Sequence, residues 1–255
     1  MAVFQSDNIE IAYEVYGKGK PIVLVHGFAS NGKINWLDTG WVEKLQAKGY
    51  APITMDNRGH GLSEKLYDPA LYPARKMAGD VARLIEHLKL VEDFGPVPIM
   101  GYSMGARICA FVGMDFGEKI SAVILGGLGI NMIHGLGGSE KIVQGLLAPS
   151  LEDVATPVGR QFRIFSQHTG SDLQALAACM QSSRDKISAK DLAKIKLPVL
   201  VAVGDIDEIG GSSEELARIF PVGQALVIKG RDHMRATGDK QFKNGVIDFL
   251  SGLTI

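Results

Sequence analysis

The stretch Val97-Pro-Ile-Met-Gly-Tyr-Ser-Met-Gly105 decides the fold, because a short apolar run leads directly into a Gly-x-Ser-x-Gly turn. A helical pattern, Ala106–Phe116, follows the turn. A strand, turn and helix in this order hold the central serine in a strained backbone conformation, and the flanking glycines let strand and helix approach closely. We therefore expect the Ser103 hydroxyl to project from the carboxyl edge of a sheet. An ordinary glycine-rich connection is the alternative.

Further apolar runs resemble the one at 97–100, and helical patterns such as Trp41–Lys48 and Lys76–Leu90 alternate with them. The runs are Ile22–Val25, Ala51–Met55, Ala122–Leu125, Val199–Val203 and Ala225–Ile228. Continuous apolar character predicts strands that are buried on both faces, as in a parallel sheet. The alternating segment Ile9–Val15 predicts an additional, antiparallel strand. We expect an α/β fold with a mostly parallel, doubly wound sheet of about eight strands, flanked by helices.

The alternation of strands and helices stops between about Gly127 and Lys196. Three stretches there look helical, namely Ile142–Leu147, Thr156–Gln167 and Asp172–Met180. Structureless loops of this length are uncommon, so we predict a helical cap inserted into a single domain that spans residues 1–255. The glycine-rich stretches 126–129 and 135–138 would be its hinge. A flexible surface excursion is the alternative.

Composition argues for a soluble protein of a reducing compartment. The 255 residues include 27 Lys and Arg against 28 Asp and Glu, a balance that disfavours nucleic acid or an anionic membrane as the main partner. The two cysteines, Cys109 and Cys179, form no disulfide framework. Residues 1–8 lack a secretory signal, and the longest apolar runs are about five residues, far below the ~20 that span a bilayer. We expect a cytoplasmic location and no membrane span.

A nucleophilic serine needs a base and an acid, because a free hydroxyl barely ionises at neutral pH. With this kind of turn, the three residues follow the chain order serine, acid, histidine. Among the six histidines, only His233 follows the last pair of predicted strands, and it lies on a loop just past residue 228. We therefore predict that His233 is the base. His134 and His168 fall in the predicted cap and are weaker candidates.

The acid is expected on the loop that follows the strand 199–203. Three carboxylates lie there: Asp205, Asp207 and Glu208. Acyl transfer also needs hydrogen-bond donors for the developing oxyanion. We expect these donors to be the backbone N–H of Met104, which follows the nucleophile, and that of Phe28, in the loop after the strand 22–25. His26 would hold that loop in place.

Five motifs together resemble the α/β-hydrolase family, in particular its small esterase, haloperoxidase-like and lactonase-like branch. They are His26-Gly-Phe28, Asp56-Asn-Arg-Gly-His-Gly-Leu-Ser63, Gly101–Gly105, Gly204-Asp-Ile-Asp207 and Gly230-Arg-Asp-His233. The resemblance covers nearly the whole chain and implies that Asp207, rather than Asp205, is the acid. It also implies that Arg58 and His60 are structural. Glu208 departs from the proline that the family usually has after the acid. Ser103 separates the chain from the dehalogenase and epoxide hydrolase branches, which have aspartate at this position.

The resemblance implies a carboxylic ester hydrolase that works on a small molecule through an acyl-enzyme. Four apolar cap residues are candidate walls of its substrate pocket: Phe162, Phe165, Met132 and Met180. Lactone hydrolysis, C–C bond hydrolysis and perhydrolysis use the same machinery. A ligand sensor or scaffold that keeps the fold without turnover is a rival from another class. The natural substrate and the oligomeric state are not legible from the sequence.

We expect neither a cofactor nor a metal ion. The segment Gly27–Ile34 fits the spacing of a phosphate-binding P-loop, but isoleucine stands where Ser or Thr would hold Mg²⁺. The sequence also lacks Gly-x-Gly-x-x-Gly, His-Glu-x-x-His and Cys-x-x-Cys motifs, which would indicate dinucleotide, zinc or redox chemistry.

Overall fold

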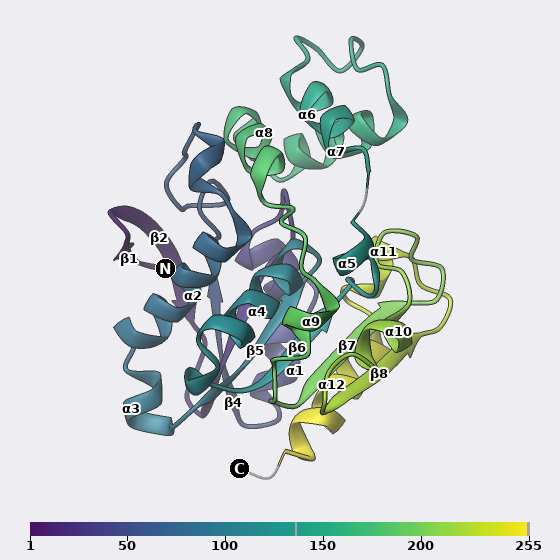
Figure 1. Cartoon of the computed structure of the whole chain (residues 1–255). Coiled ribbons are helices and arrows are strands. Elements are labelled where there is room, and N and C mark those ends of the chain that lie inside the picture. Colours follow the sequence, from purple (N-terminus) through teal and green to yellow (C-terminus); the bar gives the residue numbers. More distant parts are fainter. Residues whose placement is uncertain (136, 254–255) are drawn as a thin grey trace.

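An eight-stranded sheet forms the centre of the computed structural model, which describes residues 1–135 and 137–253 (Figure 1). The strands lie in the order β1-β2-β4-β3-β5-β6-β7-β8. Their bounds are β1 Ala2–Ser6, β2 Ile9–Val15, β3 Lys20–Val25, β4 Tyr50–Met55, β5 Val97–Tyr102, β6 Ile120–Gly126, β7 Val199–Gly204 and β8 Gly223–Ile228. β1 and β2 pair antiparallel to their neighbours and the remaining strands are parallel. The predicted mostly parallel sheet is therefore confirmed.

The sequence pattern did not predict strand β1. It pairs with β2 through a two-residue turn at Asp7 and Asn8, whose φ angles of 56° and 62° are both left-handed. Hairpin turns with two left-handed residues favour Asn, Asp and Gly, so the Asp-Asn pair is the local signal for this hairpin. Only Phe4 and Ser6 of β1 are buried, and two buried positions are too few to establish a strand pattern.

Helices cover both faces of the sheet, as the doubly wound prediction requires. Their bounds are α1 Trp41–Gln46, α2 Ala74–His87, α3 Leu90–Phe94, α4 Met104–Asp115, α5 Asn131–His134, α6 Ser139–Leu147, α7 Pro157–His168, α8 Leu173–Ser182, α9 Ala189–Leu192, α10 Ser213–Ala217, α11 His233–Ala236 and α12 Lys240–Ser251. A short π-helix, η1 Lys33–Leu37, and two 3-10 helices, η2 Pro69–Leu71 and η3 Gly117–Lys119, complete the set. The core beside α2, α4 and α10 is separate from the core beside α1 and α12.

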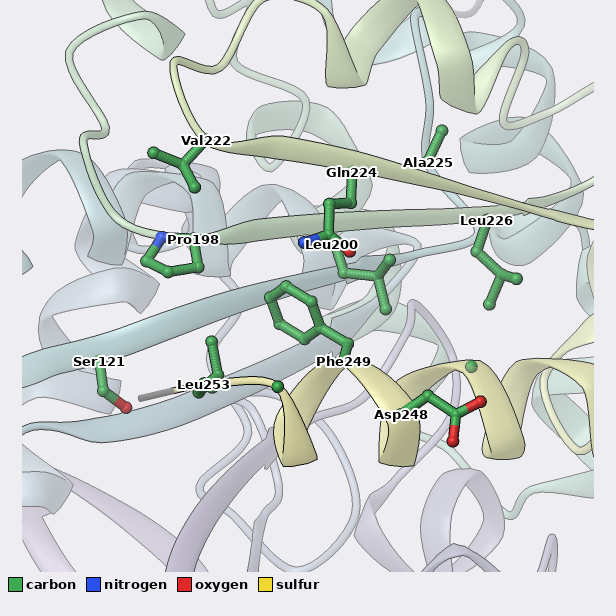
Figure 2. Close-up of a pocket in the computed structure, with 12 residues that line it drawn as sticks. Ser121, Pro198, Leu200, Val222, Gln224, Ala225, Leu226, Asp248, Phe249 and Leu253 are labelled. Carbon is green, nitrogen blue, oxygen red and sulfur yellow. The ribbon is translucent and has the colours of Figure 1, made fainter. Parts of the chain in front are cut away.

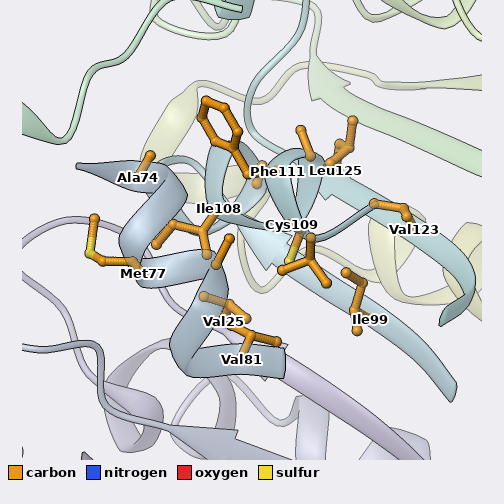
Figure 3. Close-up of a cluster of buried hydrophobic side chains, with 14 of the residues drawn as sticks. Val25, Ala74, Met77, Val81, Ile99, Ile108, Cys109, Phe111, Val123 and Leu125 are labelled. Atoms are coloured by element: carbon orange, nitrogen blue, oxygen red, sulfur yellow. The ribbon is translucent and has the colours of Figure 1, made fainter. Parts of the chain in front are cut away.

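The core beside α2 and α4 fixes the helix that follows the Ser103 turn. Figure 3 shows Met77 and Val81 of α2 and Ile108 of α4 gathered near Ile99 and Val123 of the sheet. All five side chains are fully buried. Burial of one such side chain contributes about 1.5–3 kcal/mol, so this layer anchors α4 firmly against β5 and β6.

The segment between β6 and β7 is helical, as predicted from its length. Within its described residues, 127–135 and 137–198, it forms α5 to α9 and no strand. Figure 1 shows α6, α7 and α8 as a lobe apart from the sheet. These three helices share a small core with Ala29, whose cap-side members are Ile142, Leu146, Leu176, Ala177 and Met180. We use the name cap for residues 127–196. Their status as an insertion within one domain stays a prediction.

The glycines expected to form a hinge have close neighbours at their first stretch. A Cβ atom on Gly127 would lie 2.6 Å from the ring of Tyr102, and one on Gly129 would lie 2.5 Å from the backbone of Ser212. These close contacts explain why residues 127 and 129 are glycine, so no hinge motion is needed to account for them. In the second stretch, Leu136 lies outside the described residues. The hinge stays a prediction.

Nowhere in residues 1–135 and 137–253 does a helix combine the length and the apolar character that a membrane span needs.

Candidate active site

Ser103 lies in a strained turn between β5 and α4. Its φ of 55° and ψ of −112° are unfavourable for any residue with a Cβ atom. A Cβ atom on Gly101 would lie 2.1 Å from the Gly105 carbonyl oxygen, and one on Gly105 would lie 2.0 Å from the Val25 carbonyl oxygen. The predicted need for glycine at both positions is therefore confirmed. The turn fixes where the Ser103 hydroxyl can point.

The structure brings together the three residues that we predicted as nucleophile, base and acid. Ser103 Oγ lies 3.0 Å from His233 Nε2, and His233 Nδ1 lies 2.8 Å from Asp207 Oδ2. With a neutral imidazole, Nδ1–H donates to Asp207 and Nε2 accepts from the serine hydroxyl. Asp207 is 6% exposed, so its carboxylate is shielded from water. The arrangement can take the hydroxyl proton as Ser103 attacks.

Backbone N–H groups orient the Asp207 carboxylate toward His233. Oδ1 accepts from Ile209 N–H at 2.9 Å and from Gly210 N–H at 2.8 Å, which leaves Oδ2 for the histidine. Gly210 is tightly placed, because a Cβ atom there would lie 2.6 Å from Val203. The acid is thus fixed by the loop that directly follows β7.

The two other candidate acids do not contact the histidine. Asp205 is exposed and accepts the N–H of Gly230 at 2.7 Å, with Lys229 Nζ 3.8 Å away. It therefore joins the loop after β7 to the loop after β8. Glu208 is exposed. The geometry favours Asp207 among the three.

Tyr102 holds the backbone of the candidate base, and sequence reasoning missed it. Its hydroxyl donates to the carbonyl oxygen of His233, and the two rings lie 5.5 Å apart. Burial raises the pKa of Tyr102, so its hydroxyl keeps its proton. Gly126 and Gly127 leave room for the ring, since a Cβ atom on either would lie within 3 Å of it. The glycine pair was a sequence signal for a large neighbour, but it does not say which residue fills the space.

Residues 26–30 contain the predicted oxyanion donor Phe28, and we call them the oxyanion loop for that prediction. Side chains on both sides of Gly27 hold this loop. The Gly27 N–H donates to Asn35 Oδ1 at 3.0 Å, and His26 Nδ1–H donates to the Gly27 carbonyl at 2.7 Å. The Gly27–Phe28 peptide is trans, so its N–H points away from the carbonyl that faces His26. The first N–H groups of a helix have no partner within the helix, which leaves Met104 N–H available. The Phe28 N–H thus lies within an ordered loop, and the Met104 N–H lies at the first residue of α4.

Two buried histidines support this loop in their neutral form. Burial lowers the pKa of His26 to about 4 and that of His60 to about 3. His26 Nε2 accepts the N–H of Asn57 at 2.9 Å, and His60 Nδ1–H donates to the carbonyl of Arg58 at 3.0 Å. The Arg58 guanidinium pairs with Asp80 at 2.7 Å, which ties the loop after β4 to α2. These contacts are structural, as the resemblance implied for Arg58 and His60.

Stability is expected to fall in mild acid because of these two histidines. Their folded-state pKa values lie below the ordinary value of 6.5, so the unfolded chain binds more protons between about pH 4 and 6.5. Each histidine then lowers the free energy of unfolding by at most about 1.4 kcal/mol per pH unit as the pH falls through that range. Above pH 6.5 their contribution is complete. Urea unfolding at pH 7, 6 and 5 measures this slope.

The matched variants for this measurement are His60→Gln and His168→Gln. His168 is exposed at the end of α7, so its replacement should leave the slope unchanged. His60→Gln removes one proton-binding group and should flatten the mean slope between pH 7 and 5 by about 1 kcal/mol per pH unit, whatever its effect on stability at pH 7. An unaltered slope in His60→Gln would contradict the assignment.

Three of the four candidate pocket residues pack beside the oxyanion loop. Phe162, Phe165 and Met180 belong to the same apolar cluster as Ala29, and the rings of Phe162 and Phe28 lie 5.8 Å apart. Helix α8 also reaches the start of α4, where Cys179 Sγ lies 3.8 Å from the sulfur of Met104.

Met132 differs from the other three candidates. It is fully buried in the core beside α4, and its carbonyl accepts from Arg107 Nη1 at 3.1 Å. The structure places Met132 in a different apolar cluster from Phe162, one that also contains Met104, and its role as a pocket wall stays a prediction. The sequence could not separate it, because core and pocket positions are equally apolar.

A surface cavity of about 610 Å³ lies away from these residues (Figure 2). Its lining is mainly apolar and includes Pro198, Leu200 and Phe249. The cavity lies between the amino ends of β7 and β8 and helix α12. Ser103 follows the carboxyl end of β5, so the cavity is at the opposite edge of the sheet. Its lining contributes no group to the contacts of Ser103.

Two other kinds of site, a phosphate-binding P-loop and a metal centre, can be checked against the structure. Lys33, which completes the P-loop spacing, is exposed and pairs with Asp38 at 2.7 Å. Among residues 1–135 and 137–253, no three His, Cys, Asp or Glu side chains gather as metal ligands.

Comparisons with known proteins point to one fold. A family model described as alpha/beta hydrolase fold matches residues 20–128. A non-heme chloroperoxidase, CPO-A1 of Kitasatospora aureofaciens, is 25% identical over 96% of this chain and 97% of its own length. An esterase from Exiguobacterium antarcticum superposes with a TM-score of 0.82 at 19% identity, covering 98% of this chain and 99% of the esterase. An enol-lactonase from Burkholderia xenovorans LB400 gives 0.76 at 18%, covering 98% and 100%. The resemblance drawn from the motifs is confirmed.

Proposed function

Because the chain has the α/β-hydrolase fold, we propose that it is a serine hydrolase of carboxylic esters with Ser103 as nucleophile. His233 acts as general base and then general acid, and Asp207 orients it. The backbone N–H groups of Phe28 and Met104 hold the oxyanion. The single observation that carries the proposal is the continuous hydrogen-bonded chain from Ser103 through His233 to Asp207.

The first half of the reaction forms an acyl-enzyme. Ser103 Oγ attacks the ester carbonyl while His233 Nε2 takes the hydroxyl proton, and the carbonyl oxygen becomes an oxyanion. Asp207 stabilises the imidazolium that results. Collapse of the tetrahedral intermediate breaks the C–O bond, and His233 gives its proton to the departing alcohol. Because the strained turn already aims the hydroxyl, little reorganisation is needed at this step.

The second half releases the acid. His233 Nε2 takes a proton from a water molecule as the water oxygen attacks the acyl carbonyl. The same two backbone N–H groups stabilise the second oxyanion, and loss of a single such donor typically costs about 10²–10³ in kcat. Collapse of this second intermediate breaks the bond between the acyl carbon and Ser103 Oγ while His233 returns the proton to Oγ, which frees the carboxylic acid and restores the enzyme.

A panel of p-nitrophenyl esters of graded acyl length tests the proposal. We expect saturable release of p-nitrophenol that depends on Ser103. A ligand sensor with this fold would show no turnover of any ester in the panel, and that outcome would contradict the proposal.

Perhydrolysis on the same residues is the second candidate, and the similarity to a chloroperoxidase over 96% of the chain favours it. Hydrogen peroxide would replace water in the second half of the reaction, so that the acyl group leaves Ser103 as a peroxy acid. Peroxy acid formation from an ester and peroxide, compared with acid formation in water, measures the partition between the two products.

The cap phenylalanines are expected to set the preferred acyl length. Phe162 lies against Phe28 and belongs with Phe165 to the cluster beside the oxyanion loop. Shape discrimination in an apolar pocket is modest, about 1–3 kcal/mol per methylene. Phe162→Ala and Phe165→Ala should therefore raise kcat/KM for long esters relative to short ones by about tenfold.

The matched control is Phe94→Ala, since Phe94 is exposed on α3, which Figure 1 shows at the end of the sheet away from the cap. This variant should keep the wild-type ranking of esters. If Phe162→Ala and Phe165→Ala also keep that ranking, the two phenylalanines pack the cap and do not line the substrate pocket.

A further inference from the structure

Ala29, directly after the proposed oxyanion donor Phe28, has a left-handed backbone. Its φ is 58°, a conformation that side chains with a Cβ atom rarely adopt, and the residue is fully buried. The left-handed region is roughly 5- to 30-fold less populated than the right-handed region for such residues. Surrounding contacts must therefore hold Ala29 in this conformation.

The cap supplies a contact at this residue. Thr169, which ends α7, donates its hydroxyl proton to the Ala29 carbonyl at 2.9 Å. The same hydroxyl lies 3.0 Å from the Ser166 carbonyl, which already accepts the N–H of Ser171 at 2.9 Å. The buried Ala29 carbonyl thus has the greater need of a donor. Ser171 Oγ, at 2.8 Å from Thr169 Oγ1, can donate to Thr169 and leave its proton directed at Ala29.

A second contact joins the same two segments. Phe162 of α7 packs against Phe28, the residue before Ala29, with ring centroids 5.8 Å apart. Helix α7 therefore touches two consecutive residues of the oxyanion loop, one through an apolar contact and one through a hydrogen bond. On the opposite side, His26 and Asn35 hold Gly27. The Phe28 N–H therefore lies between Gly27, which residues of the main fold hold, and Ala29, which the cap contacts.

We propose that Thr169 is a positioning residue that holds Ala29 left-handed and so directs the Phe28 N–H at the oxyanion. This inference rests on the proposed serine hydrolase function. The cap then fixes the backbone conformation of the oxyanion loop in addition to packing against it. Release of the Thr169 hydrogen bond would let residue 29 leave the left-handed region. The Phe28–Ala29 peptide would then reorient and shift Phe28, whose N–H is the proposed donor.

Thr169→Val tests the proposal, because valine keeps the shape of threonine and removes the hydroxyl. We expect kcat for a short p-nitrophenyl ester to fall about tenfold, within the 5- to 30-fold population ratio, with KM changed less than about twofold. Ser166→Ala is the matched control. The Ser166 hydroxyl lies on the same helix and donates to Phe162 O within that helix, so its loss should leave kcat unchanged.

A double-mutant cycle with Ala29→Gly separates positioning from a general loss of cap stability. Glycine enters the left-handed region as readily as the right-handed one, so residue 29 no longer needs the hydrogen bond. In the Ala29→Gly background, Thr169→Val should therefore lower kcat by less than about threefold, instead of about tenfold. An equal loss in both backgrounds, or no loss with alanine at 29, would overturn the proposal.

Covalent labelling keeps this result distinct from failure of the proposed function. A fluorophosphonate needs both the nucleophile and the oxyanion donors, so Thr169→Val should be labelled at Ser103 about tenfold more slowly than wild type. Wild-type protein that is not labelled at Ser103 would refute the serine hydrolase function itself. Labelling of both proteins at Ser103 with equal rates would refute only the role of Thr169.

Discussion

Replacement of Ser103 by alanine is expected to lower kcat for ester hydrolysis by about 10⁶-fold, the usual effect of removing the nucleophile of a triad. The fold should persist, because alanine meets the same backbone strain as serine and the flanking glycines are unchanged. Steady-state kinetics with purified protein, together with urea unfolding, measure both effects.

Ser121→Ala is the control for this substitution. Ser121 is the second residue of β6 and lies at the amino ends of the strands, whereas Ser103 lies at their carboxyl ends. Loss of the Ser121 hydroxyl should therefore leave kcat at the wild-type value. Activity of Ser103→Ala within about tenfold of wild type would exclude Ser103 as the nucleophile.

Asp207→Asn should lower kcat by about 10⁴-fold with little change in KM. Asparagine keeps the shape of aspartate and can still accept from Ile209 and Gly210, but it does not fix the His233 proton on Nδ1. The imidazole then presents the wrong tautomer to Ser103. Kinetics across a pH series with one ester measure the loss.

Asp205→Asn is the matched variant, two residues away on the same loop. Asp205 contacts Gly230 N–H and Lys229, and its replacement should change kcat by less than about threefold. If Asp205→Asn is the more damaging substitution, the acid has been assigned to the wrong residue.

The residues of the candidate site could be proposed from sequence because they lie in short local motifs. Ser103 is marked by glycines two residues away on each side, and His233 by its place after the last strand. The choice between Asp205 and Asp207 was different, since both follow β7. It needed either the family resemblance or the contact with His233 that the structure shows.

The contacts that support the site could not be predicted, because they join segments far apart in the chain. Thr169 and Ala29 are separated by 140 residues, and Tyr102 and the carbonyl of His233 by 131. Neither pair has a periodic or motif signature. The left-handed backbone of Ala29 also runs against the preference of alanine, so local sequence argues against it.

Met132 shows the same limit in the packing. Its apolar side chain fits either a pocket wall or a core position, and the sequence does not show that it packs in the cluster of Met104 and not in that of Phe162. In contrast, the buried strands were predictable because their apolar runs are continuous, and the cap helices because a long segment without strands must pack in some way.

The most direct test of the account is the site of covalent modification by a fluorophosphonate. The hydrogen-bonded chain from Asp207 through His233 makes Ser103 the activated hydroxyl, so mass spectrometry after proteolysis should find one adduct, on the peptide that contains Ser103. Ser103→Ala should carry none, and Asp207→Asn should label far more slowly than wild type. An unmodified wild-type protein, or an adduct on any other residue, would contradict the claim that this turn carries a catalytic serine.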